Sequence, residues 1–205
     1  MKKQQKSKIS ISEIENLLVF KHLENSYKLF WFKAILDEVA VGKQKIYFLD
    51  LAKQMVAESW EMVFEKNRTL GRLDRVHHIA EEIEAKWHIG EKLSKEAVRS
   101  YLNDFNEKEL SEIVADLYEE TPYTFLEPMY EDKLNKRSIN KRLPMIEALL
   151  NADEGAIYKV DSKQQCIVIN QKWLAFFKKE RRQIEAIWKD AMAYYLTRNA
   201  GERIK

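Results

Sequence analysis

The sequence is poor in the residue types that cross-link or interrupt a chain. It has one cysteine, three prolines and five glycines among 205 residues. With Cys166 alone, neither an intramolecular disulfide nor a cysteine-based metal cluster can form, so we expect a reducing compartment and a cytoplasmic location. Few glycines and prolines disfavour a turn-rich β-sandwich and favour long helices. The predicted fold class is therefore mainly α.

Residues that bind metals and phosphates are also scarce. There are four histidines, and His77 and His88 would lie about 16 Å apart along one helix, too far to share an ion. The glycines are scattered singly, so no glycine-rich phosphate loop is present, and no G-x-S-x-G nucleophile motif occurs. We expect no catalytic residue, no metal and no cofactor.

No apolar run in the sequence reaches the length of about 20 residues that a membrane span needs. The basic residues 1–9 resemble the start of a signal peptide, but Ser10, Ser12 and Glu13 break the apolar run that should follow. We therefore expect a mobile N-terminal lead-in and no membrane partner.

The most apolar segment of the chain is residues 25–40, which is apolar on two sides when wound as a helix. One side carries Tyr27, Phe30, Trp31, Ala34 and Ile35, and the other carries Leu29, Phe32, Leu36 and Val39. Only narrow polar strips remain, around Lys28, Lys33 and Asp37. Because such a helix must be covered by its neighbours, we predict a central helix with Trp31 almost fully buried.

Capping residues and helical spacing predict further helices in the first 120 residues. The first is expected to begin at a capping box of Ser12 and Glu15 and to end near Glu24. An extended stretch at 46–48 leads into a helix over about 49–66, a pattern that also occurs in winged-helix proteins and leaves that fold as a minor alternative. Later helices are expected to start after Gly71, Ser94 and Asn106.

The sequence character changes after residue 120. Pro122 and Pro128 should each push the preceding residue out of helical geometry, so we predict that 121–128 is a linker that packs against the core. A polar run over 131–142 follows, and then a short helix around 145–150 with Pro144 in its first turn. The predicted domains are a helical domain (1–120), a linker with a basic segment (121–142) and a smaller domain (143–205).

Between residues 156 and 170 the apolar period becomes two, which is typical of a β-hairpin. Ile167 and Ile169 are expected on one face, and Cys166 and Val168 on the other. Because two strands alone are marginally stable in water, the hairpin should pack on helices. The predicted architecture is a multi-helix bundle with one C-terminal β-hairpin packed on the last helices.

Positive charge is concentrated toward the C-terminus. The chain up to Tyr130 carries 19 basic and 23 acidic residues, and the remainder carries 16 and 10. This asymmetry is compatible with a face that binds nucleic-acid phosphates, although a plain solvated surface explains it as well. Tyr130 and Tyr194 could stack on bases if exposed. The candidate nucleic-acid-binding residues are Lys133, Lys136, Arg137, Lys141, Arg142, Lys178, Lys179, Arg181 and Arg182.

Several short motifs occur in a characteristic order. They are Asn-Ser-Tyr-Lys-Leu-Phe-Trp-Phe at 25–32, Ile-Tyr-Phe-Leu-Asp-Leu-Ala at 46–52, Thr-Pro-Tyr-Thr-Phe-Leu at 121–126, Ile169-Asn170 with Trp173, and Trp188 with Arg198-Asn199. Together they resemble the helical N-terminal region of bacterial HNH endonuclease-like proteins. In those relatives a ββα-metal nuclease module follows, with a histidine base and further ligands on one metal. The predicted hairpin here has no histidine, so no catalytic residue of the family can be carried over.

The resemblance implies a non-catalytic binding module that contacts duplex DNA or a protein partner in a phage-defence or mobile-element system. Two alternatives remain open. The protein could be an assembly subunit without nucleic-acid binding, which a large exposed apolar patch on the central helices would support. It could also be an enzyme with an unrecognised site in a cleft between residues 1–120 and 130–205.

Overall fold

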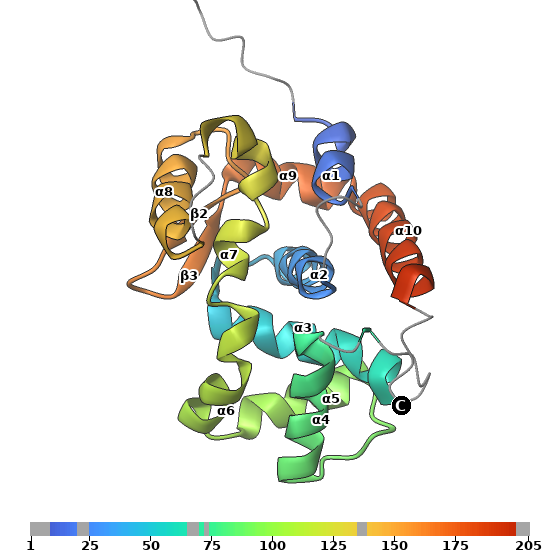
Figure 1. The fold of residues 1–205 in the computed structure, drawn as a ribbon. Helices are drawn as coiled ribbons and strands as arrows, with labels where there is room; N and C mark the ends of the chain where they lie inside the picture. Colours follow the sequence, from blue (N-terminus) through green and yellow to red (C-terminus); the bar gives the residue numbers. More distant parts are fainter. Residues whose placement is uncertain (1–8, 20–24, 65–69, 72–73, 135–138, 200–205) are drawn as a thin grey trace, which may run out of the picture.

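Helices make up most of the fold, and a small sheet lies on one side (Figure 1). A computed structural model describes residues 9–19, 25–64, 70–71, 74–134 and 139–199. The elements in chain order are α1 (Ile11–Leu17), α2 (Tyr27–Ala40), β1 (Lys45–Tyr47), α3 (Phe48–Phe64), α4 (Arg75–Trp87), α5 (Lys95–Asp104), α6 (Glu107–Val114), η2 (Ala115–Leu117), α7 (Thr121–Thr124), η3 (Glu127–Lys133), α8 (Ile139–Ala152), β2 (Tyr158–Asp161), β3 (Cys166–Ile169), α9 (Gln171–Lys179) and α10 (Arg181–Asn199). The predicted mainly α fold with a late hairpin is confirmed. Of the lead-in expected at 1–9, residues 1–8 lie outside the described residues.

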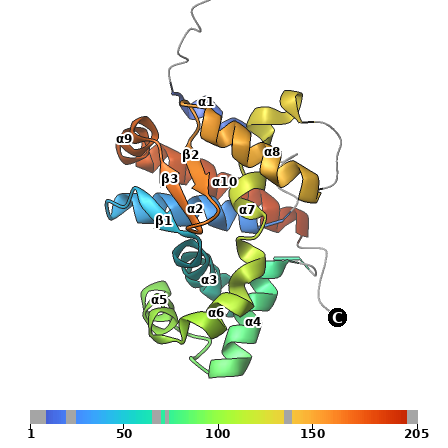
Figure 2. The same ribbon diagram turned by 90° about the vertical axis from the view of Figure 1, so that its left-hand side faces the viewer.

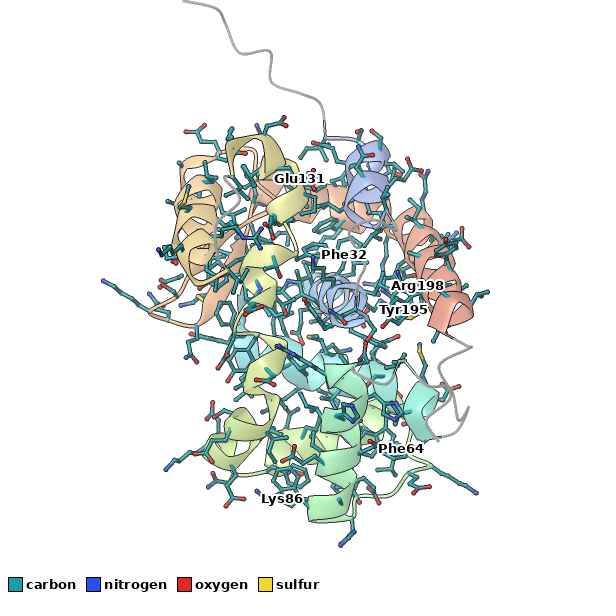
Figure 3. All side chains as sticks on the ribbon, in the orientation of Figure 1. Phe32, Phe64, Lys86, Glu131, Tyr195 and Arg198 are labelled. Atoms are coloured by element: carbon teal, nitrogen blue, oxygen red, sulfur yellow. The ribbon has the colours of Figure 1, made fainter. Side chains whose placement is uncertain are left out.

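Helix α2 occupies the middle of the molecule, as its two apolar sides predict (Figure 1). Helix α3 packs along it, and α7, α9 and α10 contact it from other directions. Trp31 has no exposed surface, which confirms its predicted burial. Phe32, labelled at the centre of Figure 3, stacks on Phe125 and meets Phe177 edge-on, with ring centroids 5.5 and 5.9 Å away. These aromatic contacts join α2 to both the α7 segment and α9.

The first helix differs from its prediction at both ends. Its N-cap is Ser10, whose N–H donates to the Glu13 carboxylate at 2.8 Å, so the capping box is Ser10–Glu13 and not Ser12–Glu15. With this start, Ile14 and Leu17 are both buried in the core. Burial of these side chains therefore decides at which serine the helix begins, because both serines could act as its cap. The helix ends at Leu17, well before Glu24, which is itself outside the described residues.

The helices between residues 74 and 114 follow local rules closely. The side chains of Ser94 and Asn106 accept hydrogen bonds from Ala97 N–H and Glu109 N–H, which confirms both predicted caps. Helix α4 is capped by Asp74, which the sequence prediction missed. Helical spacing also predicts Leu73 on the apolar stripe of this helix, but Leu73 is outside the described residues.

The segment after residue 120 is helical, so the prediction of non-helical geometry before each proline is wrong. Thr121 lies in α7 and Glu127 in η3, and each following proline occupies the first turn, where its missing N–H costs no hydrogen bond. The expectation that this segment packs against the core is confirmed, because Thr121 through Leu126 are all buried.

Helix α8 begins earlier than predicted, at Ile139, and Pro144 therefore lies inside it and not in its first turn. Leu143, Ile146 and Leu150 recur at helical spacing and pack on the core. This apolar face keeps the segment helical although the proline removes one backbone hydrogen bond.

The sheet contains three antiparallel strands in the order β1–β3–β2. The sequence predicted the hairpin of β2 and β3 but treated 46–48 as an isolated extended lead. In the structure Ile46 pairs with Ile167, so β1 completes the sheet. Ile167 and Ile169 are fully buried and Val168 is 37% exposed, as predicted, but Cys166, which was expected on the face of Val168, is buried as well. Pairing of β1 with β3 also joins the proposed N-terminal and C-terminal domains, whose boundaries stay predictions.

Candidate nucleic-acid interface

Seven of the nine candidate basic residues are among the described residues, and they come from two segments that lie apart in the structure. The first segment runs from η3 to α8 and the second lies at the junction of α9 and α10. Strands β2 and β3 lie between these two regions (Figure 2). The seven described side chains therefore do not form one continuous interface, and the geometry of each segment is considered separately.

The first basic segment is only partly available for a ligand. Lys133 and Lys141 are exposed, but Arg142 forms an ion pair with Glu127 at 2.7 Å that ties α8 to η3. Lys136 and Arg137 lie outside the described residues.

Tyr130, expected as a possible stacking platform beside this segment, is buried. Its ring is 3% exposed, its hydroxyl donates to Asp153 at 2.9 Å, and the Lys133 ammonium lies over the ring. Burial and the neighbouring Asp153 raise the pKa of the Tyr130 hydroxyl above its ordinary value. Tyr130 thus fixes the end of α8 and has no free face for a base, whereas Tyr194 is 55% exposed on α10.

The second basic segment surrounds a surface hollow of about 560 Å³. The hollow is lined by Lys178, Lys179, Glu180, Arg181, Arg182 and Gln183. It forms because α9 ends at Lys179 and α10 starts at Arg181, with Glu180 as the single residue between them. The sharp break therefore brings the last turn of one helix next to the first turn of another, which gathers cations beside the positive end of the α10 dipole.

The cations around this hollow differ in what they already bind. Lys178 and Arg182 are exposed and form no ion pair with any residue that the structure describes. Lys179 pairs with Glu180 at 2.7 Å but remains 80% exposed. We refer to Lys178, Lys179 and Arg182 as the junction cations. They are the described candidate residues most available to an anionic ligand.

Arg181 points away from the junction and into the protein. Its guanidinium donates to Leu36 O at 3.0 Å and to Asp37 at 2.9 Å, and it also pairs with Glu185. Arg181 therefore attaches the start of α10 to the last turns of α2. This role was not visible in the sequence, where Arg181 looked like its neighbours.

Asp37 is the centre of an ion-pair network that sequence reasoning treated as a solvated strip. Lys33 and Lys95 both bond to its carboxylate at 2.6 Å, and both also approach Glu58 on α3. The network joins α2, α3, α5 and α10. Since three cations meet three carboxylates once Glu185 is included, no net charge is left to attract a ligand, and the network is structural.

A pH dependence of stability follows from this network. Burial raises the pKa of Asp37, but the hydrogen bonds and charges of Lys33 and Lys95 lower it by more, so it lies below its ordinary value of 3.8. A depressed folded-state pKa stabilises the protein above the unfolded-state pKa, and this contribution is lost as the pH falls below about 4 through the folded value. We expect Asp37→Asn to cost about 1.5–3 kcal/mol at neutral pH and to flatten the acid limb of the stability curve. Urea melts at several pH values measure both effects.

The control for this prediction is Asp132→Asn, which removes the same charge from an exposed position on η3. It should leave the neutral-pH midpoint within about 0.5 kcal/mol of wild type. If Asp37→Asn and Asp132→Asn give the same acid limb, the network does not contribute as described.

Within the described residues no group of three or more histidine, cysteine, aspartate or glutamate side chains could hold a metal ion. His77 and His78 both approach Glu81, but the arrangement of these three side chains is not one that could hold an ion. No described helix is long and apolar enough to traverse a lipid bilayer.

Comparison with known proteins adds no relative. No family model matches the chain, and neither a curated protein nor a solved structure shows significant similarity. The resemblance to HNH endonuclease-like proteins therefore stays a prediction that depends on the short motifs alone.

Proposed function

We propose that this protein is a non-catalytic binding module that contacts the phosphate backbone of duplex DNA through the junction of α9 and α10. The observation that carries the proposal is the hollow of about 560 Å³ with the three junction cations at its rim. Lys178 and Arg182 have no acidic partner among the described residues, so neither loses an ion pair when a phosphate binds.

The chemistry of the junction suits a phosphate group. The first backbone N–H groups of a helix have no intrahelical acceptor, and the helix dipole adds partial positive charge at the same end. Exposed lysine and arginine side chains then neutralise phosphates and release bound counterions, which gives binding that does not depend on base sequence. Glu180 opposes this charge, but its carboxylate is held by Lys179 at 2.7 Å.

The resemblance to the HNH endonuclease-like proteins supports a positioning role. A module that holds DNA without cutting it would serve to place a nuclease on its substrate within a phage-defence or mobile-element system. The set of side chains at the junction contains no histidine or cysteine, and we expect this chain alone to leave DNA uncut with any divalent metal.

The proposal predicts how strongly the association constant for DNA depends on salt concentration. With three phosphate contacts, the logarithm of the association constant should fall with the logarithm of salt concentration at a slope of about −2.7, which weakens binding about 40-fold between about 50 and 200 mM. Fluorescence anisotropy with two labelled duplexes of unrelated sequence measures the slope, and the two duplexes should bind equally well.

Lys178→Ser combined with Arg182→Ser should reduce the slope to about −0.9. The matched control is Lys133→Ser with Lys141→Ser, which removes the same charge from the exposed residues of the first basic segment. If the control variant loses binding and the junction variant does not, the interface lies at η3 and α8 and our assignment is wrong. Absence of any duplex binding at low salt would contradict the proposed function itself.

The two other function classes have less support in the described residues. An assembly subunit was expected to expose an apolar patch on its central helices, but the apolar residues of α2 from Leu29 to Val39 are buried. A hollow of about 570 Å³ does lie between β1, α6 and the hairpin turn, where the enzyme alternative expected a cleft. Its lining includes Ser111 and Glu107 but neither a histidine nor a cysteine, and the Ser111 hydroxyl donates to Lys108 C=O.

A further inference from the structure

The two edges of the three-stranded sheet differ in whether their outward-facing backbone groups have hydrogen-bond partners. At the β2 edge, the amide of Asn151 accepts a hydrogen bond from Val160 N–H at 3.0 Å and donates to Val160 C=O at 2.9 Å. One side chain from α8 thus satisfies both outward backbone groups of this residue, as a neighbouring strand would. The β2 edge is closed, because α8 also packs along it.

The β1 edge has no such cover. Ile169 N–H donates to Gln44 C=O at 2.9 Å and Phe48 N–H donates to Gln165 C=O at 2.8 Å, so residues 44, 46 and 48 face β3. In an antiparallel ladder the intervening residues point their backbone groups the other way. The N–H and C=O of Lys45 and the N–H of Tyr47 therefore face outward, and no described residue outside the sheet bonds to them. Figure 2 shows β1 at the outer side of the sheet.

A hollow lies at the end of this open edge. It has a volume of about 570 Å³. Its lining combines Tyr47 at the end of β1 and Leu49 in the first turn of α3 with Tyr118, two glutamines of the hairpin turn and the first turns of α6. Tyr47 is 49% exposed although it belongs to a strand. Backbone groups ready to pair, next to a hollow that accepts a side chain, are the two parts of a site that binds an extended peptide.

The charge around the edge indicates which peptide would fit. On the outer face of the sheet, Val168 lies between Lys45 and Lys159 in one cross-strand row, and both lysines are exposed. Lys163 is exposed in the hairpin turn, and Lys108 lines the hollow, while Asp161 and Glu107 are the nearby acids. An acidic strand placed beside Lys45 gains from this surplus, since opposite charges across a strand pair are favourable.

We propose that the β1 edge binds an extended acidic segment of a partner protein, which adds a fourth strand to the sheet and inserts an apolar side chain into the hollow beside Tyr47. A second copy of the chain is a poorer occupant, because antiparallel pairing of two β1 strands brings like-charged Lys45 side chains together. The short length of β1 and the charge of Lys45 also disfavour non-specific pairing of this edge with other strands. An acidic partner strand is not repelled by Lys45, because its charge is opposite.

Selection of short random peptides displayed against the whole protein tests the proposal. We expect the recovered peptides to alternate acidic with apolar residues. In amide hydrogen exchange, a bound peptide should slow Lys45 and Tyr47, while Ile46, which already bonds to β3, should exchange slowly with and without peptide. Methylation of one peptide N–H that faces β1 should weaken binding by about tenfold.

The matched variants are Lys45→Glu and Lys92→Glu, which make the same charge change at exposed positions on β1 and between α4 and α5. Lys45→Glu should weaken peptide binding by about tenfold or more, and Lys92→Glu should leave it unchanged. Recovery of no peptide, or of peptides equally sensitive to both variants, would overturn the proposal. Slowed exchange at Lys45 and Tyr47 in concentrated protein without peptide would identify a second copy as the occupant and would also overturn it.

Discussion

Trp31→Ala is expected to lower the free energy of unfolding by about 3–5 kcal/mol. Trp31 has no exposed surface and lies on the central helix, where its ring meets Phe48 edge-on at 6.1 Å. Its Nε1–H donates to the Tyr158 hydroxyl at 3.4 Å, and that hydroxyl donates to Pro122 C=O at 2.7 Å. Truncation therefore leaves a cavity where α2, α3, α7 and the sheet meet.

Urea melts followed by far-ultraviolet circular dichroism measure this loss without depending on tryptophan fluorescence. Trp31→Phe distinguishes the contribution of the buried ring from that of the Nε1–H hydrogen bond. It keeps most of the side-chain volume and should cost only about 1 kcal/mol for the lost hydrogen bond. The control is Tyr101→Ala, because Tyr101 is 45% exposed on α5, and this variant should stay within about 0.5 kcal/mol of wild type. A Trp31→Ala melt that overlays wild type would show that α2 is not the centre of the core.

Asp74→Ala is expected to cost about 2–5 kcal/mol, because one buried carboxylate serves three helices. Oδ1 caps α4 by accepting Val76 N–H at 3.0 Å and His77 N–H at 3.4 Å. Oδ2 accepts Ser26 N–H at the start of α2 at 2.9 Å, and it lies 3.0 Å from the Tyr195 hydroxyl of α10. Alanine removes the cap and leaves the buried Ser26 N–H without its acceptor.

The contribution of each oxygen can be separated by Asp74→Asn. Asparagine caps a helix as well as aspartate does, but its amide NH₂ would then oppose Ser26 N–H, donor against donor. We expect the free energy of unfolding of Asp74→Asn to lie between the values for wild type and Asp74→Ala. The same urea melts measure it. Equal stability of the asparagine variant and wild type would mean that the α2 and α10 links contribute nothing.

Tyr195 gives an independent check on this link between α10 and α4. Its hydroxyl lies 2.7 Å from Leu70 C=O as well as 3.0 Å from Asp74, and Figure 3 shows Tyr195 and Arg198 on α10. Burial and the charge of Asp74 raise the pKa of this hydroxyl above its ordinary value, so it remains a donor at neutral pH. Tyr195→Phe should therefore cost about 1 kcal/mol with no change in the alkaline limb below about pH 10.

The basic residues illustrate how far a sequence can define a candidate site. Lys178, Arg181 and Arg182 look alike in the sequence, as cations of one short basic run. Arg181 nevertheless binds Asp37, which is 144 residues away along the chain, while Arg182 faces solvent. Which cation remains available depends on a partner in another helix, and no local pattern carries that information.

Local sequence predicted the central helix and the helices capped by Ser94 and Asn106, since the signals for these helices act within one or two turns. The Ser94 and Asn106 caps and the two apolar sides of α2 each follow from neighbouring residues alone. The tertiary structure decided the rest. Residues 45–47 became a strand because β3, more than a hundred residues later, pairs with them, and Asn151 closed one sheet edge but not the other. Such pairings depend on which surfaces the packed helices bring together, because burial and hydrogen bonding between distant segments override the weaker preferences of each segment alone.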